Sequence, residues 1–387
     1  MKLKLKNTPE QVELIKAIGS RDSNAAREAS EAFAAFLGPV IQKVLYSAGT
    51  AGSIYVDSEY DEDDSPSYPL DLYYDESAGY VNVWSQTMAG GLPTSHVEGM
   101  KEVKIQTYRL DSAVSFNKRY ARKARLDVVS KAIERMANEV LVKQERNAWA
   151  VLLRALIDAK TAPGDPSKNS AAFSASTHLK HVYRTVASAT ANSFDLSHLN
   201  GLMTRIKRLN ESFSGNTPAG ATGGLTDLYI SPEVMETIRA FSYNPVHTST
   251  GNDVLPNSVR EDVFRNAGMA SIYGVNLNEM VELGIGKKYN KLFDTLASSD
   301  NFFLSDGSTS GAAFTEADDQ LIVGLDNSRG SFVRPIARNG ESGSTFTALP
   351  DDQFNMYGGR VERTGFYGHL EEGRLVLDAR SIAGLII

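Results

Sequence analysis

The stretch DVVSKAIERMANEVLVKQERNAWAVLLRALIDA, residues 127–159, contains no glycine or proline and carries apolar residues at helical spacing. These residues are Val129, Ile133, Met136, Val140, Trp149, Leu152 and Leu156. Such spacing is typical of an amphipathic helix, and a rise of ~1.5 Å per residue gives this one a length of about 50 Å. Because helices in globular proteins are usually much shorter, we expect it to be the central element of the fold.

Two shorter helices are predicted upstream. The first begins at Thr8-Pro9-Glu10-Gln11, with Thr8 as N-cap, proline at the first helical position and Gln11 completing a capping box, and it ends at Gly19. The second runs from about Asn24 to Tyr46, with a kink expected at its proline. Its apolar stripe consists of Phe33, Phe36, Leu37, Ile41 and Leu45.

Charge is segregated between this helix pair and the long helix. Residues 44–100 contain ten Asp or Glu but no Lys or Arg, whereas residues 101–125 contain eight basic residues and two acidic ones. A protein that lays an acidic segment on a neighbour's basic segment gains steering and register from such a pattern. Exposed ion pairs contribute only ~0 to 1 kcal/mol each, so apolar burial must hold the assembly. The pattern predicts self-assembly, and the alternative is a solvated acidic loop before a basic helix.

The acidic stretch DSEYDEDDSPSYPLDLYYDE, residues 57–76, interleaves acids with tyrosines and predicts an extended arm with aromatic anchors. We expect residues 57–64 of this arm to contact region 101–125 of a neighbouring copy. The acidic contact residues are Asp57, Glu59, Asp61, Glu62, Asp63 and Asp64, and the basic ones are Lys118, Arg119, Arg122, Lys123 and Arg125. A solvated face and a phosphate contact remain alternatives for the basic cluster.

Composition excludes several classes of site. The chain has no cysteine, which removes disulfides, thiolate nucleophiles and cysteine-ligated metals. A net charge of −7 argues against a protein whose main task is to neutralise nucleic-acid phosphates. The acidic run fails as a calcium loop, because Glu62 stands where the loop needs glycine and Tyr68 where it needs glutamate. No segment is apolar enough for a signal peptide or a membrane span.

Enzymatic motifs are also missing. Residues 284–288 lack the spacing and the hydroxyl of a phosphate-binding loop, and residues 307–311 have threonine at the centre, where a nucleophile elbow needs serine. His178, His181 and His198 have no carboxylate placed near them by spacing, so solvated histidines are favoured over a metal site. We expect no cofactor, no metal and no enzyme activity.

Two strands, residues 80–84 and 103–114, predict a long ribbon with a turn at residues 90–93. Residues 161–192 are rich in Ala, Ser and Thr and predict a loop. A second α/β region follows. Its expected helices are 199–209, 232–241 and 259–265, its expected strands are 226–230, 272–283, 321–325 and 331–336, and residues 359–378 are expected to form a terminal hairpin.

This order of elements resembles the major capsid proteins of tailed bacteriophages, which have the Hong Kong-97-type fold, an α+β architecture. Residues 227–233, Asp-Leu-Tyr-Ile-Ser-Pro-Glu, look like the strand-to-helix step of that family's axial domain. Residues 272–276, Ile-Tyr-Gly-Val-Asn, followed by Leu283-Gly284, look like its Gly-Xaa-Val crossing strand. The resemblance covers nearly the whole chain by layout.

The resemblance implies a domain plan. Residues 1–75 correspond to the N-terminal arm, 76–102 to the E-loop, and 103–191 to the peripheral domain with the spine helix 127–159 and part of 350–387. Residues 192–349 correspond to the axial domain. In this family the arm and the E-loop reach across neighbouring subunits, and the axial domains gather around the capsomer axis.

The resemblance also implies a function. The chain would self-assemble as hexamers and pentamers into the icosahedral head shell of a virion, enclosing double-stranded DNA without sequence-specific binding. Assembly would take place in the host cytoplasm, with scaffold, portal and decoration proteins as further partners. Two alternatives remain, an encapsulin-like bacterial nanocompartment shell and an acidic cytosolic enzyme.

Two departures from the family affect assembly. If Met1 is the initiator, no long N-terminal extension acts as a built-in scaffold, so we expect guidance from elsewhere. Family members that join their subunits by Lys-Asn isopeptide bonds need a lysine in the E-loop, and residues 76–100 contain none. We therefore expect a shell without covalent links.

Overall fold

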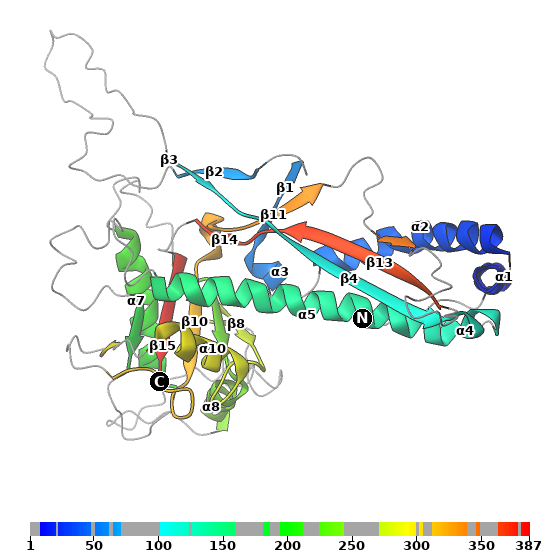
Figure 1. Ribbon diagram of the computed structural model, residues 1–387. Helices are drawn as coiled ribbons and strands as arrows, with labels where there is room; N and C mark the ends of the chain where they lie inside the picture. Colours follow the sequence, from blue (N-terminus) through cyan, green and yellow to red (C-terminus); the bar gives the residue numbers. More distant parts are fainter. Residues whose placement is uncertain are drawn as a thin grey trace, which may run out of the picture. The chain divides into compact units, whose positions relative to one another are not determined.

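The computed structural model of the 387-residue chain is a mixed α and β structure (Figure 1). It describes residues 8–20, 22–47, 51–61, 65–70, 101–123, 126–158, 181–185, 194–211, 224–243, 271–298, 302–304, 312–338, 346–348, 363–377 and 381–387. The expected strand 80–84, its turn at 90–93 and the expected helix 259–265 lie outside these residues. The general α and β character expected from the sequence is confirmed.

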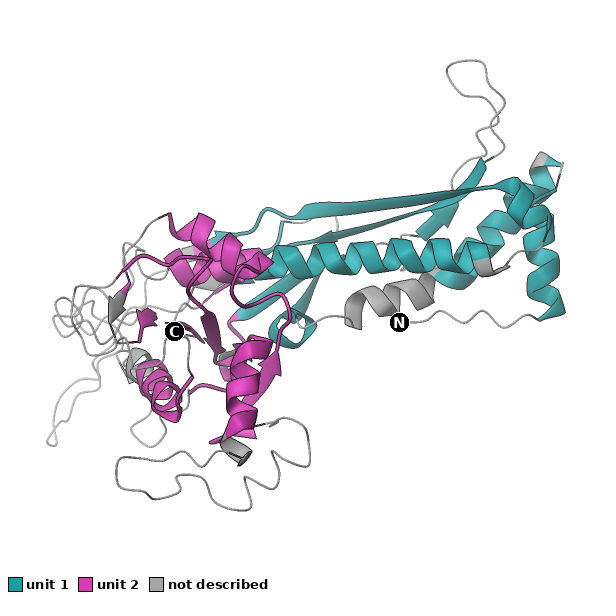
Figure 2. Ribbon diagram, turned by 90° about the horizontal axis from the view of Figure 1, so that it is seen from below, with its two compact units in different colours: residues 1–68, 103–149, 332–375 teal, residues 69–102, 150–331, 376–387 magenta. Residues whose placement is uncertain are grey.

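The chain divides into two compact units (Figure 2). Unit 1 consists of Met1–Tyr68, Val103–Trp149 and Phe332–Leu375, and unit 2 of Pro69–Glu102, Ala150–Ser331 and Val376–Ile387. The division falls within one uninterrupted helix, α5, Leu126–Asp158, which confirms the predicted long helix. The limits of the arm, the E-loop and the peripheral and axial domains stay predictions.

The remaining helices of unit 1 are α1, Pro9–Ile18, α2, Ser23–Ser47, α3, Ala51–Ile54, and α4, Lys118–Arg122. The bounds of α1 agree with the prediction, but among the described residues the Thr8 side chain makes no capping hydrogen bond. The predicted capping box is therefore wrong. The first turn is closed instead by the Thr8 carbonyl, which accepts from the Val12 N–H at 3.1 Å.

The apolar stripe of α2 is narrower than predicted. Phe33 and Leu37 are buried, whereas Phe36 is 57% exposed. Successive residues of a helix are rotated by about 100°, which turns Phe36 out of the buried stripe that Phe33 and Leu37 share. The prediction for Phe36 was wrong for this reason, and the side chains of residues 38–47 lie outside the described part.

Unit 1 is built on a mixed sheet of six strands. They are β1, Val56–Asp61, β4, Tyr108–Asn117, β11, Phe332–Arg338, β12, Phe346–Ala348, β13, Arg363–Glu372, and β14, Leu375–Val376. The order is β1-β11-β13-β12, with β14 paired to β11 and β4 to β13. β1 runs parallel to β11, and β4 pairs antiparallel with β13 along the whole of both strands.

One predicted pairing is wrong, and one lies outside the described residues. The described partner of β4 is β13, while the expected partner strand 80–84 is not among the described residues. β13 and β14 do not form the predicted hairpin, because β14 pairs with β11. Local alternation predicts a strand but not its partner, since pairing is decided by which faces can be buried together. Phe366 of β13 is fully buried, with ring centroids 5.5 Å from Phe33, 6.1 Å from Phe116 and 5.3 Å from Phe346.

Strands β2, Ser67–Leu70, and β3, Lys101–Lys104, form a separate two-stranded sheet. Beside it, the Ile105 N–H donates to the Pro66 carbonyl at 3.1 Å. The predicted arm, residues 57–76, is therefore held by pairing at β1 and β2 in its described parts.

Unit 2 contains a seven-stranded sheet in the order β7-β8-β6-β10-β15-β5-β9. The strands are β7, Ser271–Ile272, β8, Val275–Glu279, β6, Asp227–Ile230, β10, Leu321–Leu325, β15, Ile382–Ile386, β5, Val182–Arg184, and β9, Phe303–Leu304. Its helices are α7, Leu196–Glu211, α8, Pro232–Tyr243, and α10, Lys288–Ala297, and a 3-10 turn, η3, covers Asn327–Arg329. The predicted elements at β6, β10, α7 and α8 are confirmed.

Three predictions in unit 2 were wrong or missing. Residues 161–192 are not all loop, because they contain β5. Residues 272–283 are not one extended strand, because Tyr273 and Gly274 have φ of 51° and 81° and turn β7 back onto β8. Helix α10 was not predicted at all, although Tyr289, Phe293 and Ala297 recur at i, i+4 and are buried.

Candidate assembly surfaces

Strand β1 ends the sheet of unit 1 and presents acidic side chains. Its burial alternates, with Glu59 and Asp61 exposed. Asp57, by contrast, is bonded within its own chain, because Arg334 of β11 donates to its carboxylate from Nε at 2.5 Å and from Nη2 at 2.6 Å. The Arg334 side chain is only 3% exposed. The structure thus places Asp57 in an internal ion pair, while Glu62, Asp63 and Asp64 lie outside the described residues.

The predicted basic cluster is divided in the same way. Lys118 is buried, and Arg122 donates from Nε to the Gly19 carbonyl at 2.8 Å, which holds α4 against the end of α1. Arg119 and Lys123 are exposed, and Arg125 lies outside the described residues. Local charge density predicted all five as surface contacts. Packing buries Lys118, whereas Arg122 stays exposed although its Nε is hydrogen-bonded within the chain.

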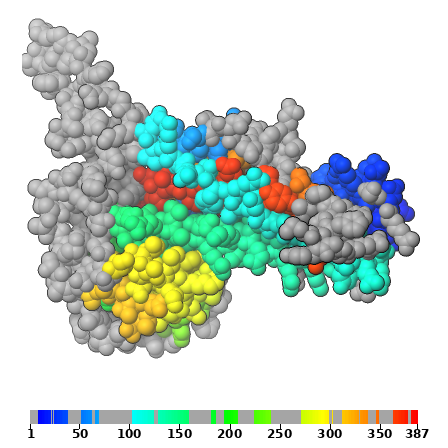
Figure 3. Space-filling model, viewed as in Figure 1, coloured from blue at the N-terminus to red at the C-terminus, as the bar shows by residue number. Residues whose placement is uncertain are grey.

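The ribbon formed by β4 and β13 lies partly at the surface (Figure 3), and every second residue of β4 is exposed. On it, Arg109 donates from Nη2 to the Tyr367 hydroxyl at 2.7 Å and from Nε to Asp111 at 2.8 Å. The Tyr367 hydroxyl donates to Asp111 at 2.5 Å. This hydrogen bond lowers the pKa of Asp111 and raises that of Tyr367. The face is therefore a defined polar surface that can contact a partner without burying unpaired charge.

The far end of the same ribbon is anchored by a buried polar network. Glu372 is fully buried and accepts from Tyr108 at 3.0 Å, from Gln144 at 3.3 Å and from Arg374 at 3.2 Å. The Arg374 guanidinium also lies 4.9 Å from the ring centroid of Tyr55. Burial, followed by the nearby Glu372 carboxylate, raises the pKa of Tyr108 to about 12. Because these donors share the buried Glu372 carboxylate as their acceptor, the network holds the end of the ribbon in place.

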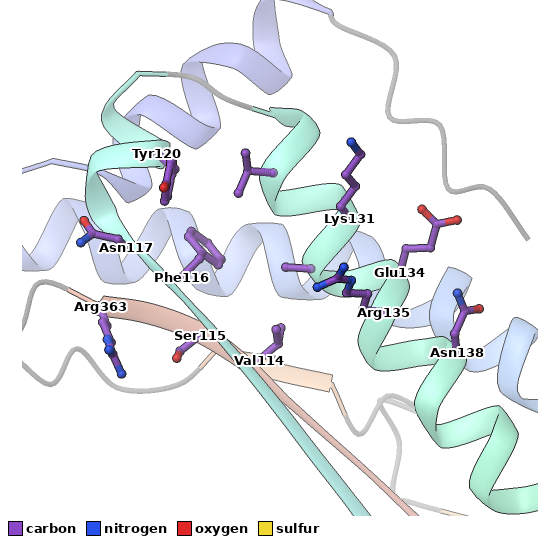
Figure 4. A pocket seen from close by; sticks show the side chains of 12 residues that line it. Val114, Ser115, Phe116, Asn117, Tyr120, Lys131, Glu134, Arg135, Asn138 and Arg363 are labelled. Atoms are coloured by element: carbon purple, nitrogen blue, oxygen red, sulfur yellow. The ribbon is translucent and has the colours of Figure 1, made fainter.

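At the opposite end of the ribbon lies a groove with a volume of about 840 Å³ (Figure 4). We call it the basic groove. Its lining comes from the end of β4, from α4, from the first turns of α5 and from the start of β13, and comprises Val114, Ser115, Phe116, Asn117, Tyr120, Val128, Lys131, Ala132, Glu134, Arg135, Asn138 and Arg363. Sequence reasoning missed Lys131, Arg135 and Arg363, because β4, α5 and β13 bring them together only in the fold.

Among the described residues, no group of three or more His, Asp or Glu side chains could hold a metal ion. His181 is buried with Nδ1 2.9 Å from the Ile382 carbonyl oxygen, so the expectation that it is solvated was wrong. His198 accepts from the Asp195 N–H at 3.1 Å, and burial lowers its pKa. His178 lies outside the described residues.

Comparison with known proteins gives structural matches. No protein-family model matches the chain, and neither does any curated protein sequence. The chain is similar to the capsid of a native GTA particle, with 13% identity, a TM-score of 0.47 and coverage of 88% of this chain and 91% of the other. For the capsid of the cyanophage P-SCSP1u the identity is 11%, the TM-score 0.45 and the coverage 86% of both chains. For the SrpI encapsulin of Synechococcus elongatus the identity is 11%, the TM-score 0.40 and the coverage 86% of this chain and 85% of the other.

Two of these solved structures are described as capsids and the third as an encapsulin complex. None of the helices in the described ranges combines the length and the apolar character needed to cross a membrane.

Proposed function

We propose that this chain is a major capsid protein that self-assembles into the icosahedral head shell of a tailed phage. The observation that carries the proposal is a pair of surfaces of opposite charge on unit 1. Glu59 and Asp61 lie exposed on the end strand β1, and Arg119 of α4 and its C-cap residue Lys123 lie exposed beside the basic groove. Within the described part of the chain none of these four side chains forms an ion pair.

Two different complementary patches on one subunit favour head-to-tail contacts. Such an interface gives a ring when the rotations between successive subunits add up to a full turn, and otherwise gives an open filament. Rings of five and six copies are what an icosahedral shell requires, and we propose these as the assembled forms. The charges set orientation and encounter rate, while burial of apolar surface holds the shell.

We propose that the shell encloses double-stranded DNA. The net charge of −7 leaves no basic excess for binding phosphates, which suits a container that holds DNA without reading its sequence. The proposed partners are scaffold, portal and decoration proteins. Assembly is proposed to take place in the host cytoplasm, and the final location is the virion. The proposed functional divisions are the arm at 1–75, the E-loop at 76–102, the peripheral domain at 103–191 and the axial domain at 192–349.

Electron microscopy of the purified chain tests the proposal. Closed shells, or rings of five and six copies, are expected, and discrete particles of one or two copies would contradict it. Mass spectrometry and nuclease treatment of shells isolated from producing cells then identify the contents. Packaged double-stranded DNA supports a phage head, whereas a packaged enzyme would show a bacterial compartment instead.

A further inference from the structure

The basic groove concentrates cations that the described part of its own chain does not neutralise. Lys131, Arg135 and Arg363 line it and are exposed, and no carboxylate within the described ranges forms an ion pair with any of them. Glu134 is the one acidic residue of the lining. Figure 4 shows Arg135 extending from α5 toward β4, while Glu134 points away from β4. In a chain with a net charge of −7, the groove is therefore a local site for an anionic ligand.

The cations belong to two sides of the groove. Lys131 and Arg135 are one turn apart on α5, which is ~6 Å along the helix axis. Arg363 stands at the start of β13, on the other side of the groove (Figure 4). Arginine can bind a phosphate through two parallel hydrogen bonds, and lysine binds it as a point charge. This arrangement favours a ligand with successive phosphates over a single small anion.

The wall formed by β4 and α4 is aromatic. Phe116 and Tyr120 line it, and the Tyr120 side chain is 45% exposed (Figure 4). A free phosphate would leave this ring uncovered. Sites for single-stranded nucleic acids combine cations that follow the phosphates with aromatic rings on which the bases stack. The basic groove has both parts of such a site.

Two amide side chains complete the lining. Asn117 accepts from the Arg119 N–H through Oδ1 at 2.9 Å, which leaves its amide nitrogen available as a donor. Asn138 is exposed on α5, and within the described ranges its side chain forms no hydrogen bond. Amide groups can donate to the edge of a base and accept from it. The groove can therefore bind a base by its edge as well as by its face.

We propose that the basic groove binds a short stretch of single-stranded nucleic acid, with its phosphates on the three cations and a base stacked on Tyr120. The volume of about 840 Å³ lies within the range of ligand sites. A double helix fits less well, because its bases are stacked on one another and none has a face free to cover the ring. An acidic peptide also fits less well, because every nucleotide carries both an anion and an aromatic face. This inference goes beyond the proposed function, in which double-stranded DNA is enclosed without a defined site on the subunit.

Fluorescence anisotropy of the purified, unassembled chain tests the inference. The probe is a labelled oligothymidylate about 8 nucleotides long, within the usual range of site sizes for single strands. Saturable binding is expected, and a stable hairpin duplex should compete at least ~10-fold less well than the unlabelled single strand. No binding, or equal competition by the duplex, would overturn the inference.

Neutralising the groove tests the phosphate contacts. Replacing its three cations together with Gln is expected to weaken binding at least ~10-fold. Each phosphate contact of a single strand contributes ~0.7 to the slope of log affinity against log salt, so the steepness should fall by about 2. The matched control removes the same charge from exposed positions outside the groove, Lys16→Gln, Lys143→Gln and Arg146→Gln, and should bind like the parent. An equal loss in the control would show that binding follows net charge alone and would overturn the groove as the site.

Two variants of Tyr120 test the stacked base. Tyr120→Phe keeps the ring and should bind like the parent. Tyr120→Leu keeps the apolar character but loses the ring, and is expected to weaken binding at least ~5-fold without changing the salt slope. Thermal melts check that both variants are folded. Equal affinity of the two variants would show that no base stacks there, and the nucleic acid would then be the wrong occupant.

Two further results would assign the groove to another occupant and overturn the inference. One is tighter binding of a polyglutamate peptide of the same charge, which would identify a receptor for an acidic peptide. The other is binding of the probe only after Asp351→Asn and Asp352→Asn, which would show that the chain's own residues occupy the groove. Closed shells from a chain that does not bind the probe would overturn this inference alone. Specific binding by a chain that forms no shells would support it and contradict the proposed function.

Discussion

Trp149 shows what a single side chain contributes to α5. It is 1% exposed, and its Nε1 donates to Glu145 at 3.1 Å, so both its apolar area and its polar atom are used. Trp149→Ala is expected to lower the free energy of unfolding by about 3 to 5 kcal/mol. Denaturant unfolding and solubility measure this, with Val142→Ala, at a position 41% exposed on the same helix, as the control. A soluble Trp149→Ala variant of parent stability would contradict the role assigned to α5.

Tyr108 predicts a dependence of stability on alkaline pH. Burial favours its neutral form and raises its folded-state pKa to about 12, whereas an unfolded tyrosine titrates near 10. The contribution of Tyr108 to the free energy of unfolding is therefore complete below pH ~10. It is lost as the pH rises toward 12, because the unfolded state then releases the tyrosine proton more readily than the folded state. Tyr108→Phe should flatten this part of the stability curve in denaturant titrations. An unchanged slope would show that Tyr108 titrates normally.

Asp57 and Asp61 occupy one strand but predict opposite phenotypes. Asp57→Asn removes the carboxylate that accepts from the buried Arg334 and is expected to cost about 1 to 3 kcal/mol of stability. Asp61 is exposed, and replacing Asp61, Glu62, Asp63 and Asp64 with Asn or Gln should leave unfolding unchanged but slow assembly. Thermal melts and light scattering at several salt concentrations measure both. Assembly of this multiple variant at the parent's rate at every salt concentration would show that these four carboxylates do not contact a neighbouring subunit.

At the scale of elements, the sequence predicted what local patterns determine. Helix α5 and the Ser231 N-cap of α8 were predictable, because spacing and capping act within a few residues, and the Ser231 hydroxyl does accept from the Val234 N–H at 3.3 Å. β5 was missed because three residues carry too little alternation. The β4 and β13 ladder was missed because its partners are far apart in sequence. The basic groove was missed for the same reason.

At the scale of the whole molecule, the shell is expected to be held without covalent bonds. The chain has no cysteine, and residues 76–100 have no lysine to form an isopeptide bond. Boiling mature particles in detergent should therefore release a single band near 42.1 kDa on a reducing gel. A ladder of stable multimers would show a cross-link of another kind.

The parallel pairing of β1 with β11 also bears on how the chain folds during synthesis. Asp57 and Arg334 are separated by 277 residues, so β1 cannot pair with β11 until the ribosome has passed Arg338. Closing so long a loop makes folding slow, and strand β1 waits unpaired in the meantime. An unpaired acidic strand is protected from premature association with identical nascent chains, because equal charges repel. The acidic side chains of residues 57–61 are therefore expected to keep the unpaired β1 strands of nascent chains apart.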